Sequence, residues 1–153
     1  MSITVTPFLW YGDNAGEAID RYLEVFPESE LVDSQNGPDG KLFIGTFRVQ
    51  GQEIVAMNGG PDHQLTEAFS LCVSVEGQEE TDRISDALIK GGGEQGPCGW
   101  LTDAFGLTWQ VIPTLLMQLM GDPDQEKAGR VRDAMMQMKR LDCDALQKAY
   151  DGA

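Results

Sequence analysis

The sequence predicts an α+β fold made of two successive βαβββ modules. In residues 3–58, and again in residues 68–113, a strand-like segment precedes an amphipathic helical segment and further strands separated by glycine-containing turns. The hairpin-like pattern of residues 47–55 also returns at residues 102–110, although few residues are identical. Paired modules of this kind can form a curved mixed sheet around a shared cavity. We therefore expect a single domain over residues 1–153 with a small-molecule cavity.

The first module is expected to begin with a strand and an amphipathic helix. Residues 3–10 are rich in β-branched and aromatic side chains, which favours a strand. Asn14 and Glu17 have the spacing of a capping box at a helix N-terminus, and Pro27 is expected to end that helix. Apolar residues at helical spacing predict its buried face: Ala15, Ala18, Ile19, Tyr22, Leu23 and Phe26.

Three further strands complete the predicted first module. They are expected at residues 31–34, 42–49 and 53–57, because these apolar segments are separated by turn residues. Residues 58–67 contain two glycines and a proline and are expected to form a loop that joins the modules.

The second module repeats this order. Residues 69–75 predict a strand, and a helix is expected from Gln78 to the glycines at residues 91–93, which end it. Its expected inward face is Ile84, Ala87 and Leu88. The three glycines are not a phosphate-binding loop, because they close a helix and no lysine follows them.

A C-terminal helical extension is expected over residues 114–150. Residues 115–120 are mostly apolar, and a further helix is expected to begin at residues 122–124. Its apolar stripe is predicted to contain Ala128, Val131, Met135, Met138 and Leu141. A stripe of this kind favours packing, either over an open sheet edge or against a second subunit.

The composition excludes several classes of partner. The chain has 153 residues, 41% of them hydrophobic, and a formal charge of −14. Nucleic acids and anionic membranes bind clustered Lys and Arg side chains, so neither is an expected partner. The cysteines Cys72, Cys98 and Cys143 lack CxxC spacing, and the sequence contains neither a signal-peptide pattern nor a membrane-spanning apolar stretch. These features favour a reduced, cytoplasmic protein.

Several motifs resemble one known superfamily. They are Pro7–Trp10, Met57–Pro61, Cys98–Asp103, Phe105–Pro113 and the tail segment over residues 122–142. In these segments the chain resembles the vicinal oxygen chelate superfamily of glyoxalases, bleomycin- and fosfomycin-resistance proteins and extradiol dioxygenases. It is most similar to the PhnB-like branch, which often carries the label 3-demethylubiquinone-9 3-methyltransferase-like. The resemblance implies a homodimer whose curved sheets enclose a cavity.

The resemblance also implies where a catalytic metal would bind. Metal-using members supply His or Gln from a first strand, His from the equivalent strand of the second module, and Glu from a late strand. The corresponding positions here are Pro7 or Phe8, Phe69 or Ser70, and Gln110. The one histidine, His63, lies in the predicted linking loop beside Asp62. We therefore expect no catalytic metal. A divalent ion held by ligands at other positions is the alternative.

The expected pocket wall combines aromatic, hydroxyl, thiol and amide side chains. The candidates are Trp10, Met57, Ser70, Cys72, Trp100 and Gln110, and each tryptophan could equally belong to the core. Strand alternation predicts that Gln110 and Trp109 point to opposite faces. Ser70 and Cys72 have no recognisable histidine base, so their catalytic role is speculative. Cys98 is expected at a strand start, as a small buried residue or a reactive thiol.

Three functions remain open at this point. The preferred hypothesis is a protein that binds a small organic molecule without a metal and without turnover. The first alternative is a metal-dependent lyase, thiol transferase or dioxygenase of the superfamily. The second is a non-catalytic dimeric structural or regulatory module. A methyltransferase is not favoured, because no glycine-rich loop joins a parallel strand to a helix in the first half.

Overall fold

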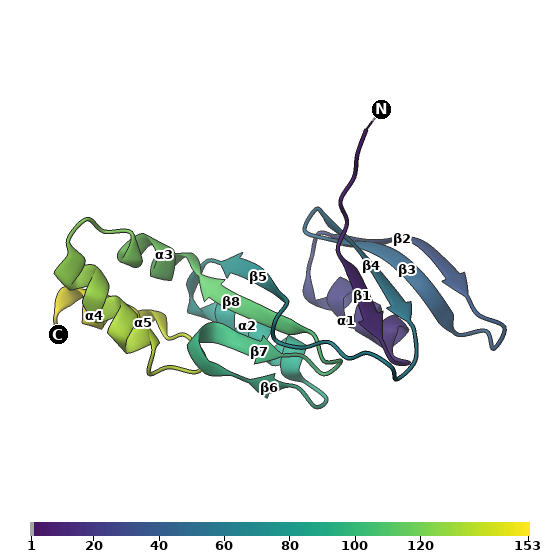
Figure 1. Ribbon diagram of the computed structural model, residues 1–153. Helices are drawn as coiled ribbons and strands as arrows, with labels where there is room; N and C mark the ends of the chain where they lie inside the picture. Colours follow the sequence, from purple (N-terminus) through teal and green to yellow (C-terminus); the bar gives the residue numbers. More distant parts are fainter. Residues whose placement is uncertain (1) are drawn as a thin grey trace. The chain divides into compact units, whose positions relative to one another are not determined.

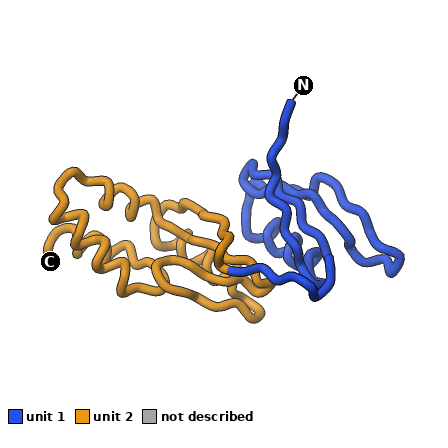
Figure 2. The backbone as a smooth tube through the Cα atoms, in the orientation of Figure 1, with its two compact units in different colours: residues 1–66 blue, residues 67–153 orange. Residues whose placement is uncertain are grey.

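The chain folds into two compact units, each built on one βαβββ module. The computed structural model describes residues 2–153, with the first unit ending at Thr66 and the second running from Glu67 to Ala153 (Figures 1 and 2). Each unit contains one four-stranded mixed sheet with a helix, and the second unit also carries the C-terminal helices. The predicted α+β class and the repeated module are therefore confirmed.

The first unit follows the predicted order of elements. They are β1 (Phe8–Tyr11), α1 (Ala15–Val25), β2 (Ser29–Asn36), β3 (Leu42–Val49) and β4 (Gln52–Asn58). The strands lie in the order β1-β4-β3-β2, with β1 parallel to β4 and the other neighbours antiparallel. A parallel pair at the edge follows from the α1 crossover, which returns the chain to the far side of the sheet.

Helix α1 covers one face of the first sheet. The hydroxyls of Tyr11 on β1 and Tyr22 on α1 lie 2.9 Å apart, within hydrogen-bonding distance. The Tyr22 ring stacks on Phe47 of β3, and Ile19 of α1 lies so close to Gly45 that a side chain there would meet it. The core of this unit therefore lies between α1 and the sheet, and the opposite face is left open.

The second unit repeats the arrangement. Its elements are β5 (Ser70–Val75), α2 (Gly77–Ile89), β6 (Glu94–Gln95), the short 3₁₀ turn η1 (Pro97–Gly99), β7 (Trp100–Thr102) and β8 (Thr108–Pro113). The strands lie in the order β5-β8-β7-β6, and β5 runs parallel to β8. Leu101, Trp109 and Val111 are buried on the side of α2.

The turn between β7 and β8 is organised by one buried carboxylate. Asp103 accepts hydrogen bonds from the backbone N–H groups of Phe105 at 2.8 Å and Leu107 at 3.0 Å. Its other oxygen accepts from Nε1 of Trp109 at 2.9 Å. Because these donors satisfy the carboxylate inside the protein, Asp103 can be 2% exposed without a buried unpaired group.

The C-terminal helices pack on the end of the second sheet. They are α3 (Thr114–Met120), α4 (Gln125–Met135) and α5 (Cys143–Asp151). Their apolar faces form one cluster with the end of β8: Ile112, Leu116, Leu119, Val131, Leu141 and Leu146. The backbone N–H groups of Cys98 and Gly99 donate to the carbonyls of Met138 and Lys139, at 2.9 and 2.8 Å. The extension therefore belongs to the second unit, and α4 begins directly after Asp124, which caps it, close to the start predicted at residues 122–124.

Two details of the first module differ from the prediction. Residues 3–7 are not part of a strand, since β1 begins only at Phe8, and Pro7 has no N–H with which to extend the ladder. Asn14 makes no capping hydrogen bond with its side chain. Instead, Oδ1 of Asn58 accepts from the N–H of Ala15 at 2.8 Å, so the cap comes from β4.

Other differences concern the helices of the second unit. Helix α2 buries Thr81, Ile84, Ser85 and Leu88, whereas Ala87, predicted to face inward, is only half-buried. Helix α4 ends at Met135, so the predicted stripe continues in a connecting segment that still packs on the same cluster. Helix α5 lies within the predicted helical extension over residues 114–150, but the sequence analysis does not distinguish it as a separate helix. Within residues 2–153, no helix is long and apolar enough to cross a membrane.

Candidate functional site

In the first unit, the predicted pocket residues lie side by side on the open face of the sheet. Trp10 of β1 is opposite Met57 of β4, and Met57 is opposite Ile44 of β3. Because neighbouring residues of each strand are buried against α1, alternation places these three side chains on the other face. Gln35 of β2 extends the series beside Ile44. We call Trp10, Met57, Ile44 and Gln35 the first row.

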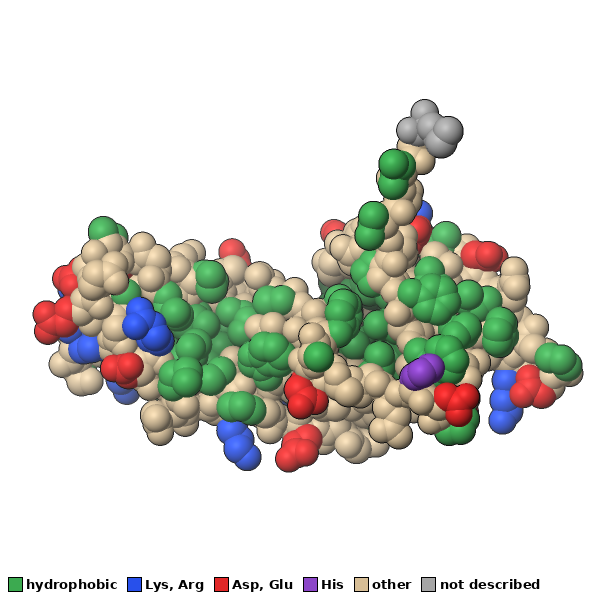
Figure 3. All heavy atoms as spheres, in the orientation of Figure 1, with side chains coloured by type: hydrophobic (Ala, Val, Ile, Leu, Met, Phe, Trp, Pro, Cys, Tyr) green, Lys and Arg blue, Asp and Glu red, His purple; other side chains and the backbone are tan. Residues whose placement is uncertain are grey.

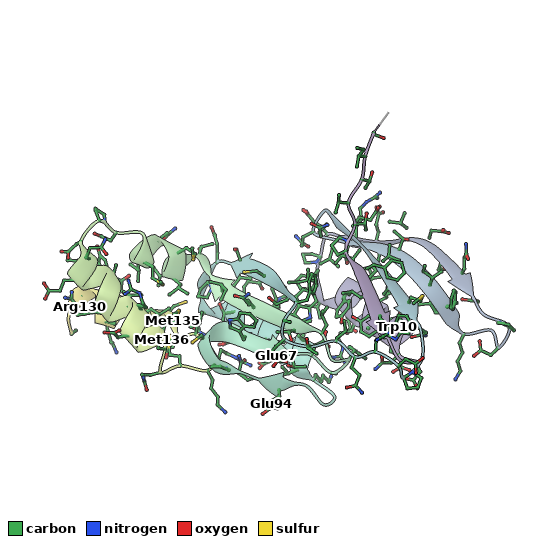
Figure 4. The ribbon with its side chains drawn as sticks, viewed as in Figure 1. Trp10, Glu67, Glu94, Arg130, Met135 and Met136 are labelled. Carbon is green, nitrogen blue, oxygen red and sulfur yellow. The ribbon has the colours of Figure 1, made fainter. Side chains whose placement is uncertain are left out.

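Trp10 is held rigidly within this row. Its indole Nε1 donates to the carbonyl oxygen of Gly60 at 2.9 Å. A Cβ atom at Gly59 would lie 2.4 Å from the indole ring, so the ring rests directly on the backbone there. The exposed His63 ring meets Trp10 edge-on, with 4.8 Å between the ring centroids. Trp10 therefore offers a fixed aromatic surface (Figure 4), and His63 is visible at the surface in Figure 3.

In the second unit, the other four candidates share the open face of the second sheet. Cys72 of β5 is opposite Gln110 of β8, which is opposite Trp100 of β7. We call these three residues the second row. Ser70 lies two residues before Cys72, on the same face, and its Oγ accepts a hydrogen bond from Nε2 of Gln110 at 3.0 Å. Trp109 is buried on the opposite face, as strand alternation predicts.

The six candidates therefore form two groups, one in each unit. The first group is apolar and aromatic, whereas the second combines an amide, hydroxyl and thiol groups with one indole. The two rows occupy equivalent places in the repeat, because each crosses the first, last and third strands of its module. The sequence signals behind the six candidates were strand position and the family resemblance.

The nucleophile-type side chains lack the partners that would activate them. Ser70 and the exposed Cys72 have no imidazole in their own unit, since the single histidine belongs to the first unit. Burial and the nearby carboxylates of Asp142, Asp144 and Asp82 raise the pKa of the Cys143 thiol, which keeps it protonated. Ser70, Cys72 and Cys143 are thus not arranged as nucleophiles with a neighbouring imidazole base.

Cys98 has a structural environment. It lies in the turn η1 with a left-handed backbone, φ 57°, and not at the strand start that the sequence suggested. Its N–H donates to the carbonyl of Met138, and its Sγ lies 3.6 Å from the carbonyl oxygen of Met135. These contacts anchor the C-terminal extension to the second sheet. They favour a small packed residue over a reactive thiol.

The residues at the expected metal positions do not fit a divalent cation. Phe8 offers no donor atom, while Ser70 and Gln110 present a neutral hydroxyl and a neutral amide that bond to each other. Among residues 2–153, no three His, Cys, Asp or Glu side chains come together as a ligand set. Divalent ions in proteins are held mainly by thiolate, imidazole and carboxylate groups, and an amide oxygen such as that of Gln110 is only one additional ligand. We therefore derive no chemistry through a metal.

A hollow at one end of the first sheet was not anticipated. It has a volume of about 490 Å³ and lies between the β1–α1 loop and the β2–β3 hairpin. Its lining includes Asp13, Asp39, Lys41, Phe43 and Asn58. The Asn58 side chain is already engaged, because it donates to the carbonyl of Leu42 and caps α1. The only sequence signal was the turn cluster of the hairpin, which identifies a turn and no binding surface.

Comparisons with known proteins agree with this fold. The model of the family described as 3-demethylubiquinone-9 3-methyltransferase matches residues 3–112. Comparison with curated proteins gives no match. A solved PhnB protein from Bacillus cereus, which carries the same methyltransferase description, is 27% identical, with coverage of 72% of this chain and 99% of that protein and a TM-score of 0.62.

Two less similar structures share the fold. A protein from Pseudomonas aeruginosa is 21% identical, with coverage of 73% of this chain and 98% of that protein and a TM-score of 0.59. The fosfomycin resistance protein FosX from Listeria monocytogenes, solved with Mn(II) and sulfate, is 20% identical, with coverage of 72% and 91% and a TM-score of 0.51. The family match ends at residue 112, so α3, α4 and α5 lie beyond it.

Proposed function

The chain belongs to the 3-demethylubiquinone-9 3-methyltransferase family of PhnB-like proteins, and from this membership we propose that it binds a small organic molecule without a resident catalytic metal. The observation that carries the proposal is the hydrogen bond between Gln110 and Ser70 on the open face of the second sheet. It joins two of the positions at which the resemblance implies metal ligands in other members. Here these positions hold neutral groups.

The second row has the composition of a ligand-binding wall. Gln110 donates one amide N–H to Ser70, and its amide oxygen can accept a hydrogen bond from a ligand. The Ser70 hydroxyl can donate its own proton. Trp100 lies beside Gln110 in the register and adds apolar area. Small-molecule sites typically combine much apolar surface with a few placed polar groups.

The first row supports the same proposal. Trp10 is fixed against Gly59 and Gly60, so little side-chain freedom is lost when a ring stacks on it. Met57 is flexible and polarisable and can adapt to the shape of a ligand. An aromatic surface with an adaptable neighbour suits a compound that contains a ring.

The β1–α1 connection does not support methyl transfer, the activity that the family description names. The connection from β1 to α1 is only Gly12, Asp13 and Asn14, and it holds one glycine. It therefore lacks the glycine-rich turn with which doubly wound folds bind a nucleotide cofactor. Methyl transfer is not part of our proposal.

Three further expectations belong to the proposal. We propose that the two modules act as one domain, that two copies of the chain form a homodimer with a ligand cavity, and that the protein is cytoplasmic. The homodimer and the cavity rest on the family resemblance. The cytoplasmic location rests on the three free cysteines, Cys72, Cys98 and Cys143.

Native mass spectrometry of protein purified without a chelator tests the proposal. We expect a dimer that carries added organic mass and no stoichiometric metal. One divalent ion per subunit would overturn the metal-free assignment, because it would require ligands other than those at the family positions.

The variant Gln110→Ala tests the site itself. It removes both the hydrogen bond to Ser70 and the free acceptor, so retained organic mass should fall while metal content stays near zero. Gln137→Ala is the matched control, because Gln137 is exposed just beyond α4. Equal retention in both variants would remove Gln110 from the site.

A further inference from the structure

The open face of the second sheet contains almost no charge. Its register positions hold serine, threonine, cysteine, glutamine and tryptophan side chains, Ile112 at one end is buried in the C-terminal cluster, and Glu94 is the one charged residue among the described positions. No lysine or arginine occupies a register position on this face. The polar groups that Gln110 and Ser70 keep available are an acceptor and a donor, and both are neutral.

The open face of the first sheet contains one cation, and that cation is already paired. Arg48 of β3 bonds to Glu30 of β2 at 2.7 Å and to Glu53 of β4 at 3.2 Å. Both carboxylates lie beside it in the register, and Asp33 adds a further negative charge one row away. Among the described residues of this face, carboxylates therefore outnumber cations three to one.

This distribution of charge discriminates against anions. An anion that leaves water needs a cation or several N–H donors to replace its hydration, and neither row presents an unpaired cation. The formal charge of −14 adds a long-range repulsion toward any negatively charged compound. A neutral compound avoids both costs and can still use the donor and the acceptor of the Ser70–Gln110 pair.

We infer, resting on the proposed function, that the ligand is an uncharged ring-containing compound with adjacent hydrogen-bonding groups, such as a carboxamide or lactam, and that carboxylates and phosphonates are excluded. The ring packs on Trp100, which is opposite Gln110 in the register, and the polar edge meets Gln110 and Ser70. Gln110 is then the residue that determines the charge of the accepted ligand.

A pair of compounds with one ring system and either a neutral or an anionic polar group tests this inference. The probes are 2-naphthamide and 2-naphthoate, which share one ring system, and their binding to the full chain is measured by isothermal titration calorimetry at low ionic strength. We expect 2-naphthamide to bind at least tenfold more tightly. Gln110→Lys should move the preference at least tenfold toward 2-naphthoate, because it places a cation in the second row.

The control separates local charge from total charge. Gln137→Lys changes the formal charge by the same amount at an exposed position beyond α4, so it should leave the preference close to that of the unmodified protein. Circular dichroism confirms that both variants are folded. An equal shift in the two variants would assign the preference to total charge and contradict the role of Gln110.

The binding of the two probes distinguishes a wrong charge preference from a wrong proposed function. Binding of 2-naphthoate as tight as that of 2-naphthamide would overturn the charge selectivity and leave small-molecule binding in place. Absence of binding by either probe at millimolar concentration would count against the proposed function and the inference together.

Discussion

At the scale of single residues, polar side chains that bond inside the chain determine much of the local structure. Asp103 organises the β7–β8 turn, and Asn58 caps α1 from a strand that is distant in sequence. Trp10 is positioned by the carbonyl of Gly60. In each case the side chain satisfies a backbone or ring group that would otherwise lose a partner on folding.

Asp103→Ala should be strongly destabilising. The change leaves the N–H groups of Leu107 and Trp109 without their carboxylate acceptor, and both residues are buried. We expect a loss of about 2–4 kcal/mol in the free energy of unfolding, measured by urea denaturation. Asp133→Ala is the control, since Asp133 is exposed on α4, and it should change stability by about 0.5 kcal/mol or less. Similar effects of both variants would refute the role of Asp103.

At the scale of elements, the C-terminal helices are fastened to one another at their ends. The Tyr150 hydroxyl on α5 donates to Oδ2 of Asp122 in the α3–α4 loop at 2.6 Å. Arg130 on α4 donates to the carbonyls of Ala149 and Tyr150, at the C-terminal end of α5. A cation near these carbonyls also complements the negative end of the helix dipole.

The bond between Tyr150 and Asp122 makes stability depend on pH. It lowers the pKa of Asp122, with help from the N–H of Asp124, so its contribution is present above the ordinary range of an aspartate and is lost as pH falls. The same bond raises the pKa of Tyr150, so the contribution is also lost as pH rises through the titration of the phenol. The stabilisation should therefore span about pH 4 to about pH 10.

Tyr150→Phe isolates this hydroxyl, because the ring that packs under the Lys127 ammonium is kept. Melting temperatures of the two proteins should differ most near neutral pH and converge near pH 2. The loss of stability in the double variant Asp122→Asn/Tyr150→Phe should be smaller than the sum of the losses in the two single variants, because both changes remove the same interaction. A difference in melting temperature that is constant across pH would exclude the bond as its cause.

The elements that the sequence predicted well are those with a strong local pattern. Helices α1 and α2 follow apolar periodicity, and the hairpins follow glycine turns. Helix α5 has only nine residues, and its start depends on Asp142, whose side chain accepts from the N–H of Ala145. The contact between Trp10 and Gly59 depends on the register of β1 and β4, which no local pattern contains. The sequence therefore placed Trp10 and Met57 on strands, but it did not predict their neighbours Ile44 and Gln35 or the rigid placement of Trp10.

At the scale of the whole molecule, we propose that the two modules unfold together as one domain. Phe47 in the first unit and Leu141 in the second are both fully buried. Replacing either with alanine should cost about 2–5 kcal/mol through lost burial and the cavity left behind.

We expect both variants to shift one shared unfolding transition in urea, followed by tryptophan fluorescence and far-ultraviolet circular dichroism. Met136→Ala is the control, because that side chain is 60% exposed and its loss should have little effect. Two resolved transitions, with only one moved by each variant, would show that the units are thermodynamically independent.

The repeat of one row in each module has an evolutionary consequence. After a duplication, both copies would have had the same side chains at these positions, yet the first row now holds Trp10, Met57, Ile44 and Gln35, and the second holds Cys72, Gln110 and Trp100. Stability depends on the helix-covered faces, so each row could diverge without loss of the core. New ligand preferences could therefore arise by substitutions in one copy at a time, while the other copy kept its own side chains.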